Sequence, residues 1–158
     1  NQELCLGNDL CMFLTLFLGI LDIQSGHFIY SNAGHLPPYL LSGDGKCRVL
    51  ELPRGKPLGL LHSAEYGVVE MALKKSDRIM LYTDGVTEAM NTDEQFFGDE
   101  RLKAWLSKQS QGMSAKIMVE QLLAEVRHFT SGAPQSDDIA LLGIRMSDNT
   151  KGGLDGAA

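Results

Sequence analysis

The chain has 158 residues, a mass of 17.3 kDa and a formal charge of −6, from 20 acidic and 14 basic residues. This is the length of one domain, and a hydrophobic content of 44% is normal for a globular protein. Because phosphate backbones are bound by clustered Lys and Arg, and no such cluster occurs here, nucleic-acid binding is excluded as the main function. A phosphorylated substrate is not excluded, since a metal ion can supply the positive charge.

The cysteines and the longest apolar run indicate a cytoplasmic protein without a membrane anchor. Cys5, Cys11 and Cys47 cannot all pair with each other, and none belongs to a Cys-x-x-Cys motif. We therefore expect buried or half-buried thiols in a reducing compartment, not zinc ligands. The apolar run at 10–21 is shorter than the roughly twenty residues that span a bilayer, and no signal-peptide pattern surrounds it. A buried strand is the better prediction for this run.

Strand signals dominate the first half of the chain. The segments 12–22 and 27–32 flank a Gly-containing turn and predict a hairpin. Further strands are predicted where apolar runs are bounded by turn residues, at 39–41, 47–52, 65–73 and 78–83.

Helical periodicity appears in the second half. A short helix is predicted from Gly98 or Asp99, because three apolar residues show the spacing i, i+3, i+4: Leu102, Trp105 and Leu106. Ser114 is placed to cap a longer helix, which the segment 131–134 ends, and a last strand follows at 139–144. Strands, then helices, then a strand predict an α+β fold with antiparallel sheet.

Carboxylates at the ends of two predicted strands are candidate metal ligands. Asp84 directly follows the strand at 78–83, and Asp137 and Asp138 lie between a Gly/Pro loop and the last strand. Adjacent carboxylates repel unless they are solvated or neutralised by a cation. Clustered hard oxygen ligands suit Mg²⁺ or Mn²⁺ and suit zinc poorly. Asp is also common in ordinary turns and loop caps, so the spacing alone leaves both interpretations open.

Six short motifs occur in one order along the chain. They are MFLT at 12–15, NAGHLPP at 32–38, KPLG at 56–59, YTDGVTEA at 82–89, FG at 97–98 and DDI at 137–139. The series resembles the bacterial SpoIIE/RsbU branch of the metal-dependent PPM (protein phosphatase 2C-like) serine/threonine phosphatases. The resemblance covers residues 12–144, and NAGHxP and YTDGVTEA are its most specific motifs.

The resemblance implies both a fold and a mechanism. The fold is an α-β-β-α sandwich of two antiparallel sheets flanked by helices, with residues 1–146 as a partial domain and 147–158 as a Gly-rich tail. In such enzymes a dinuclear Mn²⁺ or Mg²⁺ centre lies between the sheets. It lowers the pKa of a bridging water, which attacks the phosphorus in line, and no side chain is phosphorylated.

Carried over position by position, the resemblance assigns roles to individual residues. Asp84 and Asp137 are implied metal ligands, and Asp138 either binds metal or orients a water or its neighbour. Gly85 permits close backbone approach, and Glu88 holds the loop after the strand. Three residues of the NAGH motif are implied structural neighbours of the site: Asn32, Gly34 and His35. For the histidine, a structural role is favoured over acid catalysis.

One part of the family pattern does not occur in these residues. The family's first metal ligand is an aspartate in a GDVSGHG-like segment, and the 158 residues contain no such segment. We therefore expect an N-terminally incomplete sandwich, whose exposed strand edges and apolar surface favour a dimer or higher oligomer. The chain is either the C-terminal larger part of a phosphatase domain, which the presence of Asp84 and Asp137 favours, or a natural remnant without catalysis.

The favoured function is a metal-dependent serine/threonine phosphoprotein phosphatase. For this branch the resemblance implies a phosphorylated STAS-type anti-sigma-factor antagonist as substrate and a sensory or receiver domain upstream in the parent chain. The alternative is a partner-binding or regulatory module of the same fold, whose binding would not depend on Mn²⁺. A β-rich adaptor unrelated to phosphatases would require the motif series to be coincidence.

Overall fold

The computed structural model describes residues 1–147, so the tail predicted at 147–158 lies outside it except for its first residue. Within this range seven strands form two antiparallel sheets, which confirms the predicted α+β class. The strands are β1 (Leu16–Leu21), β2 (His27–Ala33), β3 (Tyr39–Leu41), β4 (Cys47–Val49), β5 (Val69–Ala72), β6 (Arg78–Tyr82) and β7 (Leu141–Arg145). The helices are α1 (Gln2–Cys5), α2 (Asp84–Thr87), α3 (Gly98–Ser107) and α4 (Ala115–Thr130).

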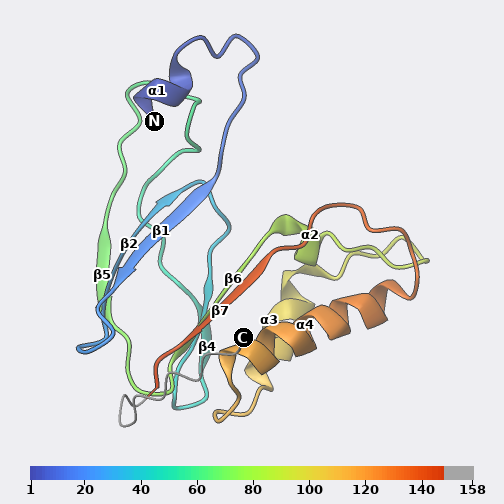
Figure 1. Ribbon diagram of the computed structural model, residues 1–158. Helices are drawn as coiled ribbons and strands as arrows, with labels where there is room; N and C mark the ends of the chain where they lie inside the picture. The colour runs from blue at the N-terminus through green and yellow to red at the C-terminus, as the bar shows by residue number, and fades with distance from the viewer. Residues whose placement is uncertain (148–158) are drawn as a thin grey trace, which may run out of the picture.

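The two sheets pack face to face, and α3 and α4 cover the outer face of one of them (Figure 1). The strand orders are β1-β2-β5 and β4-β3-β6-β7. Between the sheets, Phe28 and Tyr30 of β2 pack against Leu40 of β3 and Ile79 of β6. The core under the helices includes Met80, Tyr82, Leu102, Leu106, Met118, Leu122 and Val126. Among the described residues no helix lies over the outer face of the three-stranded sheet.

Helix α4 forms where the sequence predicts it. The Ser114 hydroxyl oxygen accepts a hydrogen bond from the backbone N–H of Ile117 at 3.2 Å and caps the helix. Its fully buried residues recur every four positions and face the sheet: Met118, Leu122 and Val126. After Thr130, Ser131 adopts a left-handed φ of 52° and starts the segment 131–140, which returns the chain to β7.

The prediction of a buried strand at 12–22 is wrong in both extent and burial. Strand β1 begins only at Leu16, although Leu14 makes an isolated bridge with Leu58. β1 is an edge strand of the three-stranded sheet. Because successive side chains of a strand point to opposite faces of its sheet, Phe17 packs toward the core while alternate residues face outward. Leu18 is 57% exposed and Ile20 68% exposed. The outer face of β1 is therefore an uncovered apolar surface.

Five further strands differ from the predictions at their ends. β2 ends one residue later than predicted, and β6 ends one residue earlier. β4 and β5 are shorter than predicted because each pairs with only a few residues of its neighbour. β7 starts two residues later than predicted. The four-residue helices α1 and α2 were not predicted. The prediction of buried or half-buried thiols is wrong for Cys11, which is exposed, while Cys5 and Cys47 are half-buried; all three are free.

Within residues 1–147, no helix is both long and apolar enough to cross a bilayer.

Candidate cation site at the ends of β6 and β7

The threonine before Asp84 joins the two segments that carry the candidate ligands. Its backbone N–H donates to the Ala140 carbonyl (3.1 Å), and its hydroxyl accepts the Ala140 N–H (2.9 Å). The same hydroxyl of Thr83 donates to the Asp138 carbonyl (2.9 Å). Because β6 and β7 are adjacent antiparallel strands, these three bonds hold the end of β6 against the start of β7. Asp84 is thereby placed beside the segment that contains Asp137.

Gly85 lies where the two segments are in close contact. It is buried, and a Cβ at this position would be 2.5 Å from the Asp138 carbonyl oxygen and 3.2 Å from that of Asp137. Real Cβ atoms essentially never come within 3.0 Å of a heavy atom, and backbone cannot swing aside as a flexible side chain can. A glycine is therefore needed here for the segments to meet.

The carboxylates are exposed and partly committed to local hydrogen bonds. Asp84 Oδ1 accepts the Gly85 N–H at 3.0 Å, and Asp137 Oδ1 accepts the Asp138 N–H at 2.6 Å. Each of these two side chains therefore still has a second oxygen with which to bind a cation. Carboxylate oxygens are the donors that Mg²⁺ and Mn²⁺ prefer, so the donor chemistry fits the metals implied by the resemblance.

The number of donors is smaller than a closed metal centre needs. Among residues 1–147, no three His, Cys, Asp or Glu side chains converge in a way that could hold a metal ion. Asp84, Asp137 and Asp138 therefore do not form a complete metal site by themselves within residues 1–147. A dinuclear centre at this position requires further oxygen ligands.

Hydrogen bonds from the flanking residues stiffen both segments. The Glu88 N–H donates to the Asp84 carbonyl at 2.7 Å, closing the short helix α2. Ser136 donates its hydroxyl to the Glu88 carbonyl at 3.1 Å, and the Gln135 side-chain amide donates to the Asp137 carbonyl at 2.8 Å. The backbone of Glu88 thus links the turn after Asp84 to the segment before Asp137.

The phenol of Tyr82 lies on the helix side of β6, one residue before this junction. Burial raises its pKa, and the nearby Asp99 carboxylate raises it further. The neutral hydroxyl donates to Asp99 Oδ1 at 3.3 Å, which connects the end of β6 to the first turn of α3. Tyr82 therefore supports the position of the strand end.

The NAGH motif shapes a neighbouring loop. Asn32 is buried in β2, and its side-chain oxygen has no hydrogen-bond partner within residues 1–147. Gly34 has a φ of +76°, and a Cβ there would lie 2.5 Å from the Pro57 ring. The loop containing NAGH is therefore packed on the KPLG segment.

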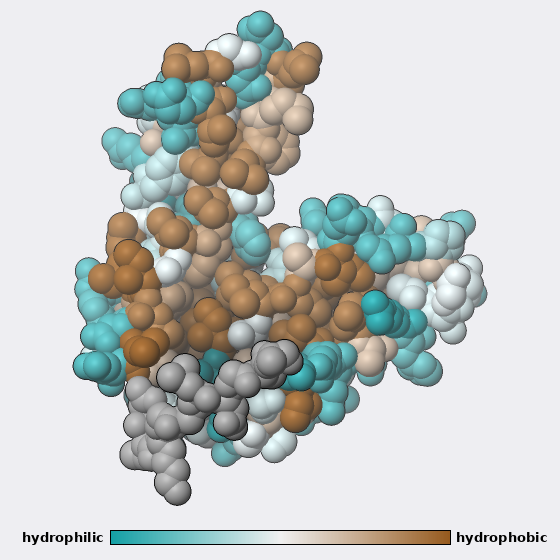
Figure 2. Space-filling model, viewed as in Figure 1, coloured by the Kyte–Doolittle hydropathy of each residue, from teal (hydrophilic) through white to brown (hydrophobic). Residues whose placement is uncertain are grey.

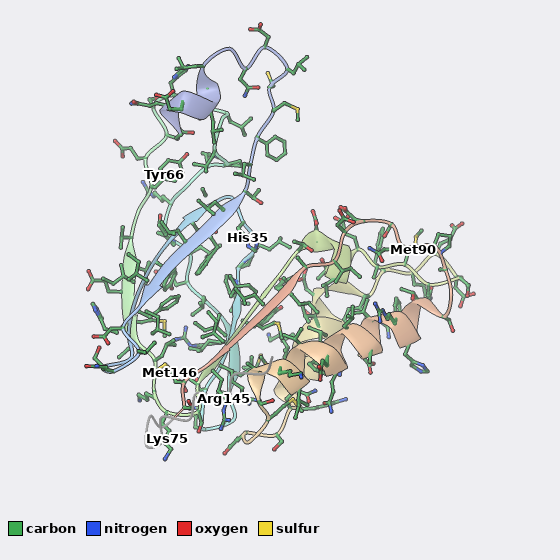
Figure 3. The ribbon with its side chains drawn as sticks, in the orientation of Figure 1. His35, Tyr66, Lys75, Met90, Arg145 and Met146 are labelled. Carbon is green, nitrogen blue, oxygen red and sulfur yellow. The ribbon has the colours of Figure 1, made fainter. Side chains whose placement is uncertain are left out.

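The imidazole of His35 is held within this loop and does not reach a carboxylate. Its Nδ1 lies 2.8 Å from the Leu36 carbonyl oxygen, and its ring stands edge-on to Phe17 with centroids 6.5 Å apart. His35 and Thr83 line one cavity together with residues of β1 and β7. His35 is labelled in Figure 3. His35 is therefore a neighbour of the junction.

Sequence reasoning gave no role to Thr83, Gln135 or Ser136, although these residues hold the two segments in place. Thr83 belongs to the YTDGVTEA motif, so its place beside Asp84 could have indicated a role at the site. Nothing in the sequence indicated that Ser136 bonds across to Glu88, because the two residues are 48 positions apart.

The fold is that of protein phosphatase 2C domains of known structure. The PP2C domain of SiaA from Pseudomonas aeruginosa superposes with a TM-score of 0.70 at 21% identity, covering 83% of this chain and 51% of that one. The phosphatase domain of SpoIIE from Bacillus subtilis, in crystals presoaked with Mn, gives a TM-score of 0.66 at 22% identity, covering 87% and 58%.

The chain belongs to the SpoIIE family. The family model described as Stage II sporulation protein E matches residues 1–147. Protein IcfG of Synechocystis sp. is 31% identical over 137 residues, which are 86% of this chain and 21% of IcfG. Phosphoserine phosphatase RsbU of Bacillus subtilis is 32% identical over 115 residues, which are 72% of this chain and 33% of RsbU. The chain thus spans about a fifth to a third of the length of these relatives.

Proposed function

We propose that the protein is a metal-dependent serine/threonine phosphoprotein phosphatase and that residues 1–146 form part of its catalytic domain. The observation that carries this proposal is the junction at which Thr83 and Gly85 hold Asp84 against the segment containing Asp137. Family membership supports it, since RsbU is described as a phosphoserine phosphatase.

In this proposal Asp84 and Asp137 hold Mn²⁺ or Mg²⁺, and Asp138 either adds an oxygen ligand or orients its neighbour. When bound, the cations supply positive charge for the phosphoryl oxygens and acidify a water molecule. The remaining residues act as positioning groups. Thr83 fixes the distance between the segments, Gly85 allows their contact, and the 135–138 loop is held in place by its own hydrogen bonds.

The proposed substrate is a phosphorylated STAS-type protein, with a sensory or receiver domain upstream in the parent chain. One structural neighbour, Rv1364c from Mycobacterium tuberculosis, contains RsbU and RsbW domains and is 27% identical with a TM-score of 0.61. This supports a role in a phosphorylation-based regulatory system, in which the catalytic domain acts on a protein.

Phosphate release is the direct test of the proposed function. The full-length protein with Mn²⁺ is expected to release inorganic phosphate from a phosphoserine protein, and EDTA is expected to abolish the release. The released phosphate is measured with wild-type protein, with added EDTA and after Mn²⁺ is restored. Release that EDTA leaves unchanged would contradict metal dependence, and no release in Mn²⁺ would contradict the function.

A non-catalytic partner-binding module is the second candidate. It is favoured by the small number of convergent donors, since residues 1–147 contain no group of three metal-binding side chains. It predicts that a partner binds equally well with Mn²⁺ and with EDTA. The phosphatase proposal instead requires phosphate release that depends on the metal. Measurements with Mn²⁺ and with EDTA therefore distinguish the phosphatase from the binding module.

We expect the chain to associate through the outer face of β1. This edge strand carries no charged residue, and its outward side chains are apolar: Leu16, Leu18 and Ile20. Figure 2 shows apolar side chains gathered along this side of the molecule. Such an edge and face are normally covered in a soluble protein. The double substitution Leu18→Lys/Ile20→Lys is expected to shift the chain from oligomer to monomer in light scattering.

The matched control adds the same charge elsewhere, as Phe96→Lys/Ile117→Lys, at two exposed apolar residues away from β1. This control is expected to leave the oligomer intact. A monodisperse monomer for the unsubstituted chain would contradict the prediction.

A further inference from the structure

A cavity of about 290 Å³ lies beside the candidate cation site, on its helix side. It is bounded by α2, by the C-terminal half of α4 and by the segment 131–139, which arches from the end of α4 back to β7 (Figure 1). Met90, labelled in Figure 3, is one of its lining residues. The cavity is distinct from the exposed carboxylates of Asp84, Asp137 and Asp138, none of which lines it.

The lining of the cavity is apolar in part and polar in part. Leu123 and the fully buried Val126 face it from α4, and Ala89 and Ile139 face it from the chain on either side of the junction. A ligand with an apolar part can therefore place it against these residues, while its polar part meets the polar side of the lining.

Three polar side chains of the lining already make hydrogen bonds, among them Gln135, whose amide donates to the Asp137 carbonyl. The Thr130 hydroxyl donates to the Arg127 carbonyl, and the Ser136 hydroxyl donates to the Glu88 carbonyl. Arg127 is an exposed residue, and its side chain forms no ion pair within residues 1–147. It is the one charged side chain among the lining residues, and no carboxylate lines the cavity. The charge of the cavity therefore complements a single anionic group.

The position of the cavity links it to both candidate ligand segments. Gly85, next to Asp84, and Ser136, next to Asp137, both belong to its lining. A molecule in the cavity would thus contact the two pieces of chain whose approach builds the junction. This makes the site suitable for an effector that stabilises or alters that approach.

We propose that this cavity is a binding site for a small amphiphilic anion. Its apolar body lies against Leu123 and Val126, and its carboxylate or phosphate group pairs with the guanidinium of Arg127. Guanidinium–carboxylate pairs with two parallel hydrogen bonds are among the stronger charge-assisted contacts in proteins. The proposal concerns binding by this chain and does not depend on the proposed phosphatase activity.

Octanoate and its neutral analogue octanamide are the probes that test the proposal. Each is titrated into the isotope-labelled chain while backbone amide shifts are followed by NMR. We expect saturable shifts at Gly85 and Ser136, with octanoate binding about twofold to fivefold more tightly than octanamide. Arg127→Gln is expected to remove this preference, and Ala133→Phe, which fills the cavity from its wall, is expected to abolish binding of both probes.

The control variant is Lys116→Gln, which removes the same charge from the exposed face of the first turn of α4. It is expected to keep the preference for octanoate. The proposal is overturned if the two probes bind equally, if Arg127→Gln retains the preference, or if the shifts lie on the exposed face of β1. Shifts on β1 would indicate adsorption to apolar surface.

Discussion

Replacing Asp84 with asparagine is expected to lower the rate of phosphate release by the full-length protein about a hundredfold or more. Asparagine keeps the size of the side chain and an oxygen that can accept the Gly85 N–H, which bonds Asp84 Oδ1 at 3.0 Å. The substitution therefore removes the negative charge that a cation needs while leaving the local structure in place. Asp137→Asn is expected to have a similar effect for the same reason.

The control for this prediction is Asp93→Asn, on an exposed loop between α2 and α3. It makes the same chemical change away from the junction and is expected to leave the rate unchanged. Rates are measured at saturating Mn²⁺, with thermal unfolding as a check on stability. An Asp84→Asn protein that keeps the wild-type rate would show that the carboxylate has no part in the reaction.

Gly85→Ala is expected to destabilise the chain by about 1–3 kcal/mol and to remove most of the activity. The new methyl group would lie 2.5 Å from the Asp138 carbonyl oxygen and 2.9 Å from its carbonyl carbon. Both atoms belong to the backbone, so relief requires the two segments to move apart. That movement would also stretch the Thr83 hydroxyl bond to Asp138. The free energy of unfolding is measured by denaturant titration.

Gly112→Ala is the matched control, because its nearest neighbour would be the Ser110 hydroxyl oxygen at 3.9 Å. It is expected to change the free energy of unfolding by less than about 0.5 kcal/mol. Equal stability of the Gly85→Ala and Gly112→Ala proteins would mean that the close contact at the junction is not required.

Local patterns predicted those elements whose ends carry their own signals. The strand at 39–41 has the predicted bounds because Pro37 and Pro38 precede it and a Ser-Gly-Asp-Gly turn follows. Helix α4 was predicted by its serine cap and its four-residue apolar spacing. The burial of β1 could not be predicted, because nearly all its residues are apolar and the pattern does not show which face is covered. Which face of β1 is covered depends on elements that are far from it in the sequence.

The candidate ligands were found from their places at strand ends, and the sequence suggested that strand ends facing one another across a sandwich could bring Asp84 near Asp137 or Asp138. In the structure the two segments meet within one sheet. Their proximity depends on β6 and β7 being neighbours, with Thr83 and Ala140 bonded across 57 positions of sequence. The apolar pattern within each strand does not show which strands are neighbours in the sheet. The family motifs supplied this information, because they include residues of both segments.

The most direct test of a shared cation site is line broadening by paramagnetic Mn²⁺ in the NMR spectrum of the 158-residue chain. At the lowest Mn²⁺ concentrations, amide signals at 84–88 and at 137–139 are expected to broaden together, and Asp84→Asn is expected to remove the broadening from both segments. Broadening that starts instead at Asp99 and Glu100 in the first turn of α3, or that Asp84→Asn leaves unchanged, would contradict a cation site built from these two segments.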